Sequence, residues 1–211
     1  METYLKKLAT QAWQTAGARY NAARRLRQRE LFSTISLAMF SALSIAIASL
    51  QLVYSDELSK CMIQYLTAFS ISLGLLILTF TLMEWGSSNS TRAAELHSNA
   101  ENINSFQSKI WLSISQLKDG FPHTWAEIET LRSEYEDIKQ SCSANHSPLD
   151  HKLFVSNHRK APEFSSKAPH GWRHLLTKFS WYFSSVWYYI ISWFAIAAAI
   201  LSAPIISGTC S

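Results

Sequence analysis

The sequence predicts an all-α integral membrane protein with a two-helix transmembrane hairpin, long cytosolic helical extensions and a third, C-terminal transmembrane helix. Three apolar runs without any charged residue support this prediction, over residues 31–54, 61–83 and 179–206. Each run is longer than the roughly 20 residues that a helix needs to cross about 30 Å of hydrocarbon. The alternative is a soluble protein with very hydrophobic core helices, but such helices normally carry charge on one face.

The first element, residues 1–30, is expected to be a basic cytosolic helix that leads into the first span, residues 31–54. It contains no proline and a single glycine, Gly17. Its apolar stripe is thin and rich in alanine, so it suits close packing against another helix; a solvated lead-in to the span is the alternative. The stripe repeats at helical steps of three and four: Leu5, Leu8, Ala12, Ala16, Ala23 and Leu26.

A second cytosolic helix is predicted after the second span, residues 61–83, and covers residues 87–118. Its apolar residues follow a near-heptad spacing, which is typical of a helix that packs along one face. The sequence Asp-Gly-Phe-Pro at residues 119–122 then interrupts the pattern, because glycine and proline both disfavour a continuing helix.

A third cytosolic helix is predicted over residues 124–140, where Thr124 and Glu127 have the spacing of a capping box. This helix is acidic. Its carboxylates are candidates for docking on the basic arm of the same or a neighbouring subunit, and an ordinary solvated face is the alternative. Its apolar face consists of Trp125, Ile128, Leu131, Tyr135 and Ile138.

Residues 141–178 are predicted to form a linker in which short ordered pieces can occur, because three prolines exclude a continuous helix. The third run, residues 179–206, follows, and residues 207–211 form a short outer tail. Aromatic residues such as Trp181 and Tyr182 crowd the first half of this run, and amphipathic rings favour the headgroup level of a bilayer. The run is therefore expected to be anchored at one interface and to span from about Trp187; a re-entrant or surface-lying helix is the alternative.

The distribution of lysine and arginine predicts the orientation. These residues are concentrated in the N-terminal arm and between the second and third runs, whereas the hairpin loop has Lys60 alone and the tail after Ile206 has none. Short basic segments resist translocation, so the N-terminus is expected in the cytoplasm and the hairpin loop outside. The formal net charge of +4 is then explained by topology and by contact with membrane lipid, and no direct nucleic-acid binding is expected. Cys61 and Cys210 would both lie outside, where an oxidising compartment would allow a disulfide.

No catalytic, cofactor-binding or metal-binding residues are predicted. The sequence has no phosphate-binding glycine-rich loop and no nucleophile elbow, and its seven histidines do not show the spacing of a zinc site, with His170 and His174 the pair nearest to it. The spans also lack the ionisable residues that proton-coupled transporters use. An enzyme is therefore not expected.

The spans do carry small and hydroxylated residues, which let helices approach closely or line a narrow wet path. Such hydroxyls often bond back to their own helix, which is the simpler interpretation of each one. Three spans cannot enclose a pore, so conduction would require a homo-oligomer. The residues predicted for helix packing or pore lining are Ala38, Ser41, Ala42, Ser44, Ala46, Thr67, Ser70 and Gly74.

Two segments and the hairpin between them resemble the SLATT family, the two-transmembrane effector domains associated with SMODS and SLOG proteins. The segments are Ala-Arg-Tyr-Asn-Ala-Ala-Arg-Arg-Leu at residues 18–26 and Thr-Arg-Ala-Ala-Glu-Leu-His at residues 91–97. The resemblance covers residues 1–140. It implies a bacterial inner-membrane effector of anti-phage, abortive-infection defence, triggered by a sensor partner or a nucleotide. It also implies similarity to a subgroup that has a third span and is encoded beside reverse transcriptases.

Signal transmission would then need an element that couples the cytosolic helices to the spans. We expect it in the arm and in the helix after the second span, at Arg19, Arg24, Arg25, Arg92, Leu96 and Ile103. Two other functions remain open. A non-conducting anchor that recruits a cytosolic enzyme would leave planar bilayers impermeable, and a holin-like lysis protein would be encoded beside a lysin.

Overall fold

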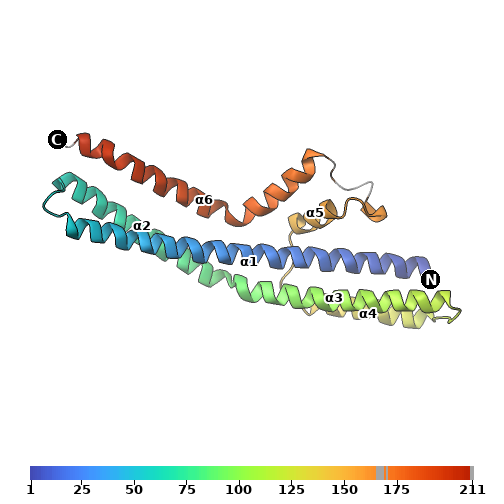
Figure 1. The fold of residues 1–211 in the computed structure, drawn as a ribbon. Coiled ribbons are helices and arrows are strands. Elements are labelled where there is room, and N and C mark those ends of the chain that lie inside the picture. The colour runs from blue at the N-terminus through green and yellow to red at the C-terminus, as the bar shows by residue number, and fades with distance from the viewer. Residues whose placement is uncertain (165–168, 170, 210–211) are drawn as a thin grey trace. The chain divides into compact units, whose positions relative to one another are not determined.

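A computed structural model describes residues 1–164, 169 and 171–209 of the chain, and within these residues it contains helices and no strand (Figure 1). The all-α fold class is thus confirmed. The elements are α1 (Glu2–Val53), α2 (Lys60–Ser87), α3 (Asn89–Lys118), α4 (Trp125–Gln140), α5 (Pro148–Asn157), the 3-10 turn η1 (Pro162–Phe164) and α6 (Trp172–Thr209).

Three stretches of helix are long and apolar enough to cross a membrane, which agrees with the three predicted runs. They lie within Glu2–Val53, Lys60–Lys118 and Trp172–Ala203. The N-terminal arm and the first span form one uninterrupted helix, α1. A tight turn follows, and the hydroxyl of Ser59 caps α2 by accepting a hydrogen bond from the backbone N–H of Met62 at 3.2 Å.

The chain divides into two compact units. The extramembrane unit comprises Met1–Arg27 and Ser90–Ser185; the membrane unit comprises Gln28–Asn89 and the described residues from Val186 onward. The membrane unit exposes many large apolar side chains, including Ile45, Leu75 and Phe194. Exposed apolar surface of this extent requires a hydrocarbon environment, which agrees with a membrane protein.

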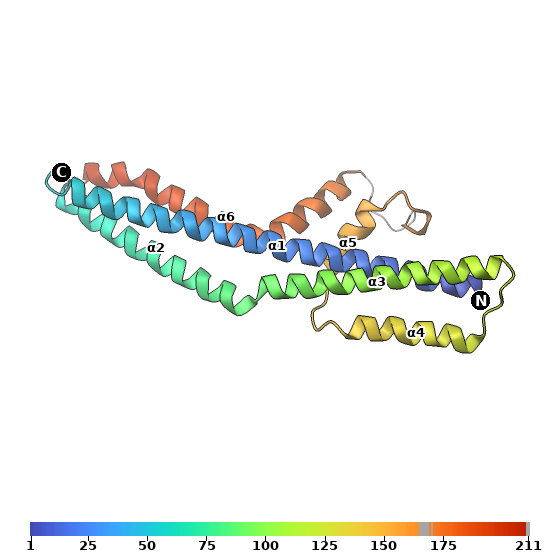
Figure 2. The same ribbon diagram turned by 60° about the horizontal axis from the view of Figure 1, so that its bottom comes forward.

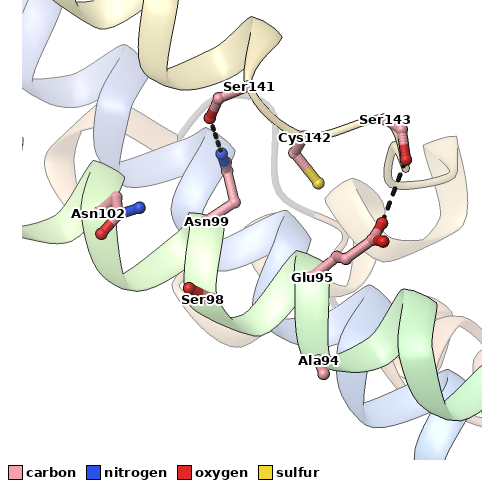
Figure 3. Close-up of a pocket in the computed structure, with 8 residues that line it drawn as sticks. All are labelled: Ala94, Glu95, Ser98, Asn99, Asn102, Ser141, Cys142 and Ser143. Atoms are coloured by element: carbon pink, nitrogen blue, oxygen red, sulfur yellow. Dashed lines mark hydrogen bonds between the residues drawn. The ribbon is translucent and has the colours of Figure 1, made fainter.

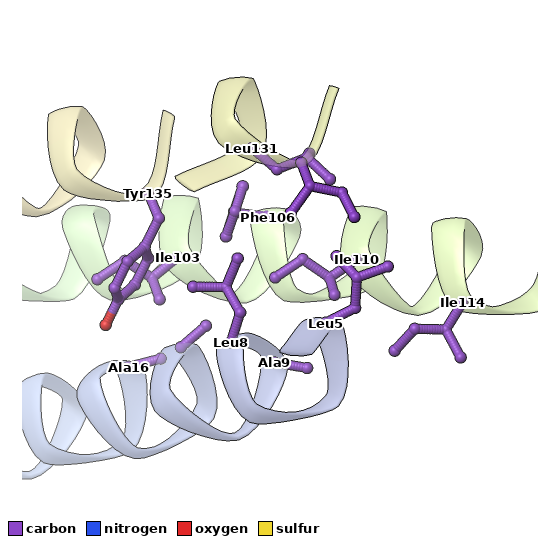
Figure 4. Close-up of a cluster of buried hydrophobic side chains, with 12 residues drawn as sticks. Leu5, Leu8, Ala9, Ala16, Ile103, Phe106, Ile110, Ile114, Leu131 and Tyr135 are labelled. Atoms are coloured by element: carbon purple, nitrogen blue, oxygen red, sulfur yellow. The ribbon is translucent and has the colours of Figure 1, made fainter. Parts of the chain in front are cut away.

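In the extramembrane unit, the first half of α1 packs against α3 and α4, and α4 runs back along α3 (Figure 2). Figure 4 shows the core of this packing, in which small α1 residues such as Ala9 and Ala16 face larger α3 and α4 side chains. The alanines allow close helix approach, as the thin stripe in the sequence predicts. The buried members of this core are Leu5, Leu8, Ala9, Ala12, Ala16, Ile103, Phe106, Ile110, Ile114, Ile128, Leu131 and Tyr135.

The capping box that opens α4 is present. The backbone N–H of Thr124 donates to the Glu127 carboxylate at 2.8 Å, and the backbone N–H of Glu127 donates to the Thr124 hydroxyl at 3.3 Å. Trp125 lies in the first turn of α4, at the end of the predicted apolar face, and its side chain is 65% exposed, whereas Ile128 and Leu131 are buried. Most carboxylates of α4 face solvent, as expected for an ordinary solvated helix face. The ion pair between Lys109 and Glu134, at 2.6 Å, links α3 to α4.

The predicted linker over residues 141–178 contains short ordered pieces, namely α5, η1 and the first turns of α6. Ser147 and Asp150 form a second capping box, and Pro148 occupies the first helical turn. A proline at that position has the φ angle of a helix and lacks only an N–H that would be unpaired there. Pro148 therefore starts a helix, although the sequence prediction took it as a helix breaker.

The membrane unit packs the hairpin of α1 and α2 against α6. Its buried core consists of Phe40, Ile47, Leu73, Phe80, Tyr189 and Ile196. Polar contacts tie the helices as well: the Gln51 amide donates to the Thr67 hydroxyl at 2.9 Å, and the Trp193 indole donates to the Ser36 hydroxyl at 3.1 Å. Each of these contacts pairs neutral groups.

Candidate functional site

The candidate functional site is a set of buried polar side chains in the extramembrane unit. Hydrocarbon and protein interiors both penalise a charge that has no partner, so a buried ionic group needs compensation and often has a function. Among the described residues of this unit, Arg19 and Asp150 are the buried charged residues. Each of them joins three segments of the unit that are distant in sequence.

Arg19 connects α1 to α3 and to the end of α4. Its guanidinium donates to the side-chain oxygen of Asn99 and, at 3.0 Å, to the backbone carbonyl of Lys139. Asn99 in turn donates to the carbonyl of Ile138 at 2.6 Å and to the Ser141 hydroxyl at 3.2 Å. Burial lowers the pKa of the Arg19 guanidinium below its ordinary value. Neutral oxygens compensate the buried cation here. A movement of the end of α4 would remove the Lys139 carbonyl, and the buried charge of Arg19 would then be poorly compensated.

A surface pocket of about 520 Å³ opens beside this network, between α3 and the segment that follows α4 (Figure 3). Glu95 closes one side by accepting a hydrogen bond from the Ser143 hydroxyl at 3.1 Å. The lining is polar and contains no basic residue. It comprises Ala94, Glu95, Ser98, Asn99, Asn102, Ser141, Cys142 and Ser143.

Asp150 connects α5 to α1 and to the first turns of α6, and its side chain has no exposed surface. Arg25 donates to both carboxylate oxygens at 3.0 Å, which is a bidentate geometry. The Trp181 indole donates at 2.8 Å, and the backbone N–H and hydroxyl of Ser147 each donate at 2.8 Å. Asn21 adds a bond from its amide to the backbone carbonyl of Asp150 at 3.0 Å.

The electrostatics of Asp150 follow from these contacts. Burial by itself raises the pKa of a carboxyl group, but the hydrogen bonds and charge of Arg25, with the Ser147 bonds, outweigh it and hold the pKa of Asp150 below its ordinary value. The carboxylate is therefore ionised at neutral pH. It acts as the N-terminal cap of α5 and as the counter-ion of α1 at the same time.

Gly17 is where α5 makes its closest approach to α1. A Cβ atom on Gly17 would lie 2.0 Å from Cε2 of Phe154. The Phe154 ring is held by further aromatic contacts, edge-on to Trp13 with centroids 5.1 Å apart and against Phe164 at 5.8 Å. The single glycine of the N-terminal arm is therefore required by the docking of α5.

The predicted coupling residues divide into two groups in the structure. Arg19 and Arg25 take part in the buried polar contacts, and Leu96 and Ile103 are buried in the helical core. Arg24 and Arg92 are exposed. The residues that sequence reasoning missed are Asp150, Asn21 and Trp181. The Ser-Pro-x-Asp spacing at residues 147–150 is a capping-box signal that could have identified Asp150 as a helix cap, although nothing in this spacing indicates Arg25 as its partner.

Trp181 does not have the predicted environment. It was expected to anchor the third run at a membrane interface, but its side chain is buried in the extramembrane unit and bonded to Asp150. A bond to a fully buried carboxylate orients the indole toward protein. Trp181 therefore serves as a bonding partner of Asp150, whereas Tyr182 beside it is exposed.

The predicted packing residues of the spans do not form the core of the membrane unit. Ala38, Ala42 and Ala46 are exposed, and so are Thr67 and Gly74. Ser41, Ser44 and Ser70 are half-buried. The core instead uses large residues such as Phe40 and Phe80. Contact between copies of the chain, or pore lining, by the small residues remains a prediction.

No group of three or more His, Cys, Asp or Glu side chains in the described part of the chain is arranged to hold a metal ion. His170 and Cys210, which entered the predictions for a histidine pair and a disulfide, lie outside the described residues. Cys142 is a free cysteine at the pocket beside Asn99.

His146 predicts a pH dependence of stability. Burial lowers its pKa, and the positive charges of Arg19 and His151 lower it further against an opposing effect of Asp150. As pH falls below the ordinary value of 6.5, the unfolded chain takes up a proton that folded His146 resists, so the free energy of unfolding decreases. We expect His146→Gln to make the fall in Tm between about pH 7.5 and about pH 5.5 shallower by a few degrees. Identical slopes for the variant and the wild type would contradict this role of His146.

The sequence profile of "SMODS and SLOG-associating 2TM effector domain family 5" matches residues 1–205. No curated protein and no solved structure matches the chain. The match includes the third apolar helix up to residue 205, which the earlier resemblance over residues 1–140 did not cover.

Proposed function

Because the chain belongs to SMODS and SLOG-associating 2TM effector domain family 5, a family of membrane effector domains, we propose that it is an anti-phage effector that permeabilises the bacterial inner membrane. In this proposal the extramembrane unit receives a signal and the membrane unit assembles with other copies. The N-terminus would lie in the cytoplasm, in keeping with the basic residues of the arm.

The observation that carries the proposal is the contact between α1, α5 and α6 through Asp150. Helices α1 and α6 each continue from the extramembrane unit into the membrane unit without a break. A ligand or partner that changes the contacts of α5 therefore acts on two helices that also form spans. A trigger of this kind works through different affinities for the resting and active states.

The exposed small residues support assembly. Ala38, Ala42 and Ala46 repeat every fourth residue along α1, and each of them is exposed in the described part of the chain. Helices in lipid associate by close packing of such faces, since lipid tails supply little hydrophobic drive. A homo-oligomer would provide the several subunits that a pore requires.

Infection of cells that express the chain with its neighbouring genes tests the proposal. Membrane potential, followed with a voltage-sensitive dye, should collapse before growth stops. Growth arrest at unchanged potential would exclude permeabilisation. Whether a neighbouring gene encodes a reverse transcriptase or another sensor would identify the proposed partner.

A non-conducting anchor is the second candidate, and the exposed surface of α4 favours it. Trp125 and the acidic residues Glu127 and Glu129 face solvent on this helix. An aromatic residue among carboxylates is suited to binding a basic protein. Purified chain in planar bilayers separates the two functions, because an anchor would give no current with or without its partner.

A further inference from the structure

Glu84 is the most heavily bonded side chain of the membrane unit that the structure describes. Its Oε1 accepts from Arg29 Nε at 3.3 Å, from the Tyr189 hydroxyl at 2.9 Å and from the Tyr188 hydroxyl at 3.4 Å. Its Oε2 accepts from the Asn89 amide at 2.7 Å and from the Ser87 hydroxyl at 3.5 Å. The carboxylate thus joins α1, α2 and α6 at one point, and its side chain is 15% exposed.

The guanidinium of Arg29 has a second contact in the same cluster. It lies over the Tyr188 ring, with Cζ 5.3 Å from the ring centroid. Within the described part of the membrane unit, Arg29–Glu84 is the ion pair that the structure contains. Burial next to hydrocarbon strengthens such bonds and makes an unpaired partner costly.

The Glu84 cluster lies close in sequence to the three points at which the chain passes from one unit to the other. The chain passes between the two units at Arg27/Gln28, at Asn89/Ser90 and at Ser185/Val186. Residues of the Glu84 cluster lie within a few positions of all three crossings. A rearrangement of the extramembrane unit that is transmitted along the backbone into the spans therefore passes through helices that Glu84 joins.

The joint between α2 and α3 is part of the cluster. Ser88 separates these helices with a φ of 47°, in the left-handed region that a non-glycine residue adopts at some energetic cost. The residues on both sides of it, Ser87 and Asn89, donate to the Glu84 carboxylate. The same carboxylate thus stabilises a strained break between helices and the attachment of α6.

The remaining polar contacts of α6 in the membrane unit have a different character. Near the other end of the hairpin, the Tyr65 hydroxyl donates to the backbone carbonyl of Ala199 at 2.7 Å. The Trp193 indole donates to Ser36. These bonds pair neutral groups, so breaking one of them leaves no buried charge behind.

We propose that Glu84 is the residue that latches α6 onto the hairpin in the resting state, and that activation breaks its bonds to Tyr188, Tyr189 and Arg29. The role of the latch in activation rests on the proposed function. The bonds by which Glu84 holds α6 do not depend on it. Arg29, Glu84 and Tyr188 then mark the membrane boundary of all three spans. The helix from Tyr189 to Thr209 still suffices to cross the hydrocarbon at about 1.5 Å per residue.

The first test measures the latch without reference to conduction. Full-length wild type and Glu84→Gln are placed in lipid nanodiscs, and amide hydrogen exchange is followed for residues 84–90 and 186–192. Glutamine keeps the size of the side chain but removes the charge that Arg29 faces, so exchange of both segments should rise roughly tenfold or more. Tyr65→Phe is the matched control, since it removes a neutral bond between α2 and α6; it should change exchange of these segments less than about twofold.

The second test measures leakage of a self-quenched dye from liposomes that contain the same proteins, with no trigger added. Glu84→Gln should release dye roughly tenfold faster than wild type or Tyr65→Phe. Unchanged exchange in Glu84→Gln overturns the latch whatever the leakage. Raised exchange with no leakage supports the latch and instead counts against permeabilisation as the function.

A further variant covers the case in which Glu84→Gln does not fold. Tyr189→Phe leaves the ion pair intact and removes one hydroxyl that donates to Glu84. It should raise exchange of residues 186–192 by a smaller factor, and more than Tyr65→Phe does. Equal exchange in the two tyrosine variants would overturn the latch.

Discussion

Replacing Gly17 by alanine is expected to detach α5 from α1 and to lower the free energy of unfolding by about 3 kcal/mol, since overpacking of this severity lies at the upper end of its usual range. The new Cβ would lie 2.0 Å from Cε2 and 2.1 Å from Cδ2 of Phe154, and that ring is enclosed by Trp13, His158 and Phe164. Thermal unfolding and limited proteolysis of residues 141–171 should both show the change.

The expected loss of stability is opposite in sign to the usual effect of this substitution in a helix. Glycine to alanine inside a helix normally stabilises it by up to about 1 kcal/mol. Gly86→Ala in α2, where no atom lies within 4 Å of the added Cβ, is the matched control and should be neutral or stabilising. Phe154→Ala in the Gly17→Ala background removes the ring that clashes, so the double variant should lose less stability than the sum of the single variants. If the stability losses of the two single variants simply added up in the double variant, Gly17 and Phe154 would not be in contact.

Replacing Asp150 by asparagine should destabilise the extramembrane unit by about 3–5 kcal/mol, because it removes one partner of a buried ion pair. Arg25 would lose its counter-ion, and the new amide group would face the indole of Trp181 and the N–H of Ser147, which are also donors. Hydrogen exchange of α5 and the Tm of the purified chain would measure the effect. In cells, the variant should lose triggered membrane depolarisation.

Glu129→Gln serves as the control for Asp150→Asn. Its carboxylate is exposed and lies 3.9 Å from Arg132 one turn away, so its removal should change stability by less than about 1 kcal/mol. Equal destabilisation by the two variants would contradict the role assigned to Asp150. The pH dependence has a defined direction as well. Because folding lowers the pKa of Asp150, its contribution is complete above the ordinary value of 3.8 and is lost as pH falls through the lowered pKa.

The sequence predicted the fold class and most helices because these depend on local patterns. Uncharged runs identify spans, a Thr-x-x-Glu spacing identifies the start of α4, and a thin alanine stripe identifies the packing face of α1. Periodicity groups Trp125 with the apolar face of α4, but it does not show that this residue of the first turn is exposed.

The candidate site was only partly predictable, because its contacts join residues far apart in the chain. Arg25 and Asp150 are separated by 125 positions, and outside this site, in the membrane unit, Glu84 and Tyr189 are separated by 105. Arg19 and Arg25 could be singled out as charged residues on a helix that leads to a span. Asp150, the partner of Arg25, could not be singled out, since α5 was predicted as part of a linker, and Trp181, which also bonds to Asp150, was predicted as an interfacial residue. At Asp150 and at Glu84, tertiary contacts rather than local sequence patterns determine the surroundings of the residues.

Because the partners in these contacts lie far apart in the chain, they are synthesised at different times. The hairpin of α1 and α2 can enter the membrane while α5 and α6 are still unmade, since segments near the N-terminus emerge from the ribosome first. At that stage Arg25 has no Asp150 and Glu84 has no Tyr189. A chain released before Pro148 would carry two spans without either contact, so the last third of the polypeptide supplies the buried partners of both Arg25 and Glu84.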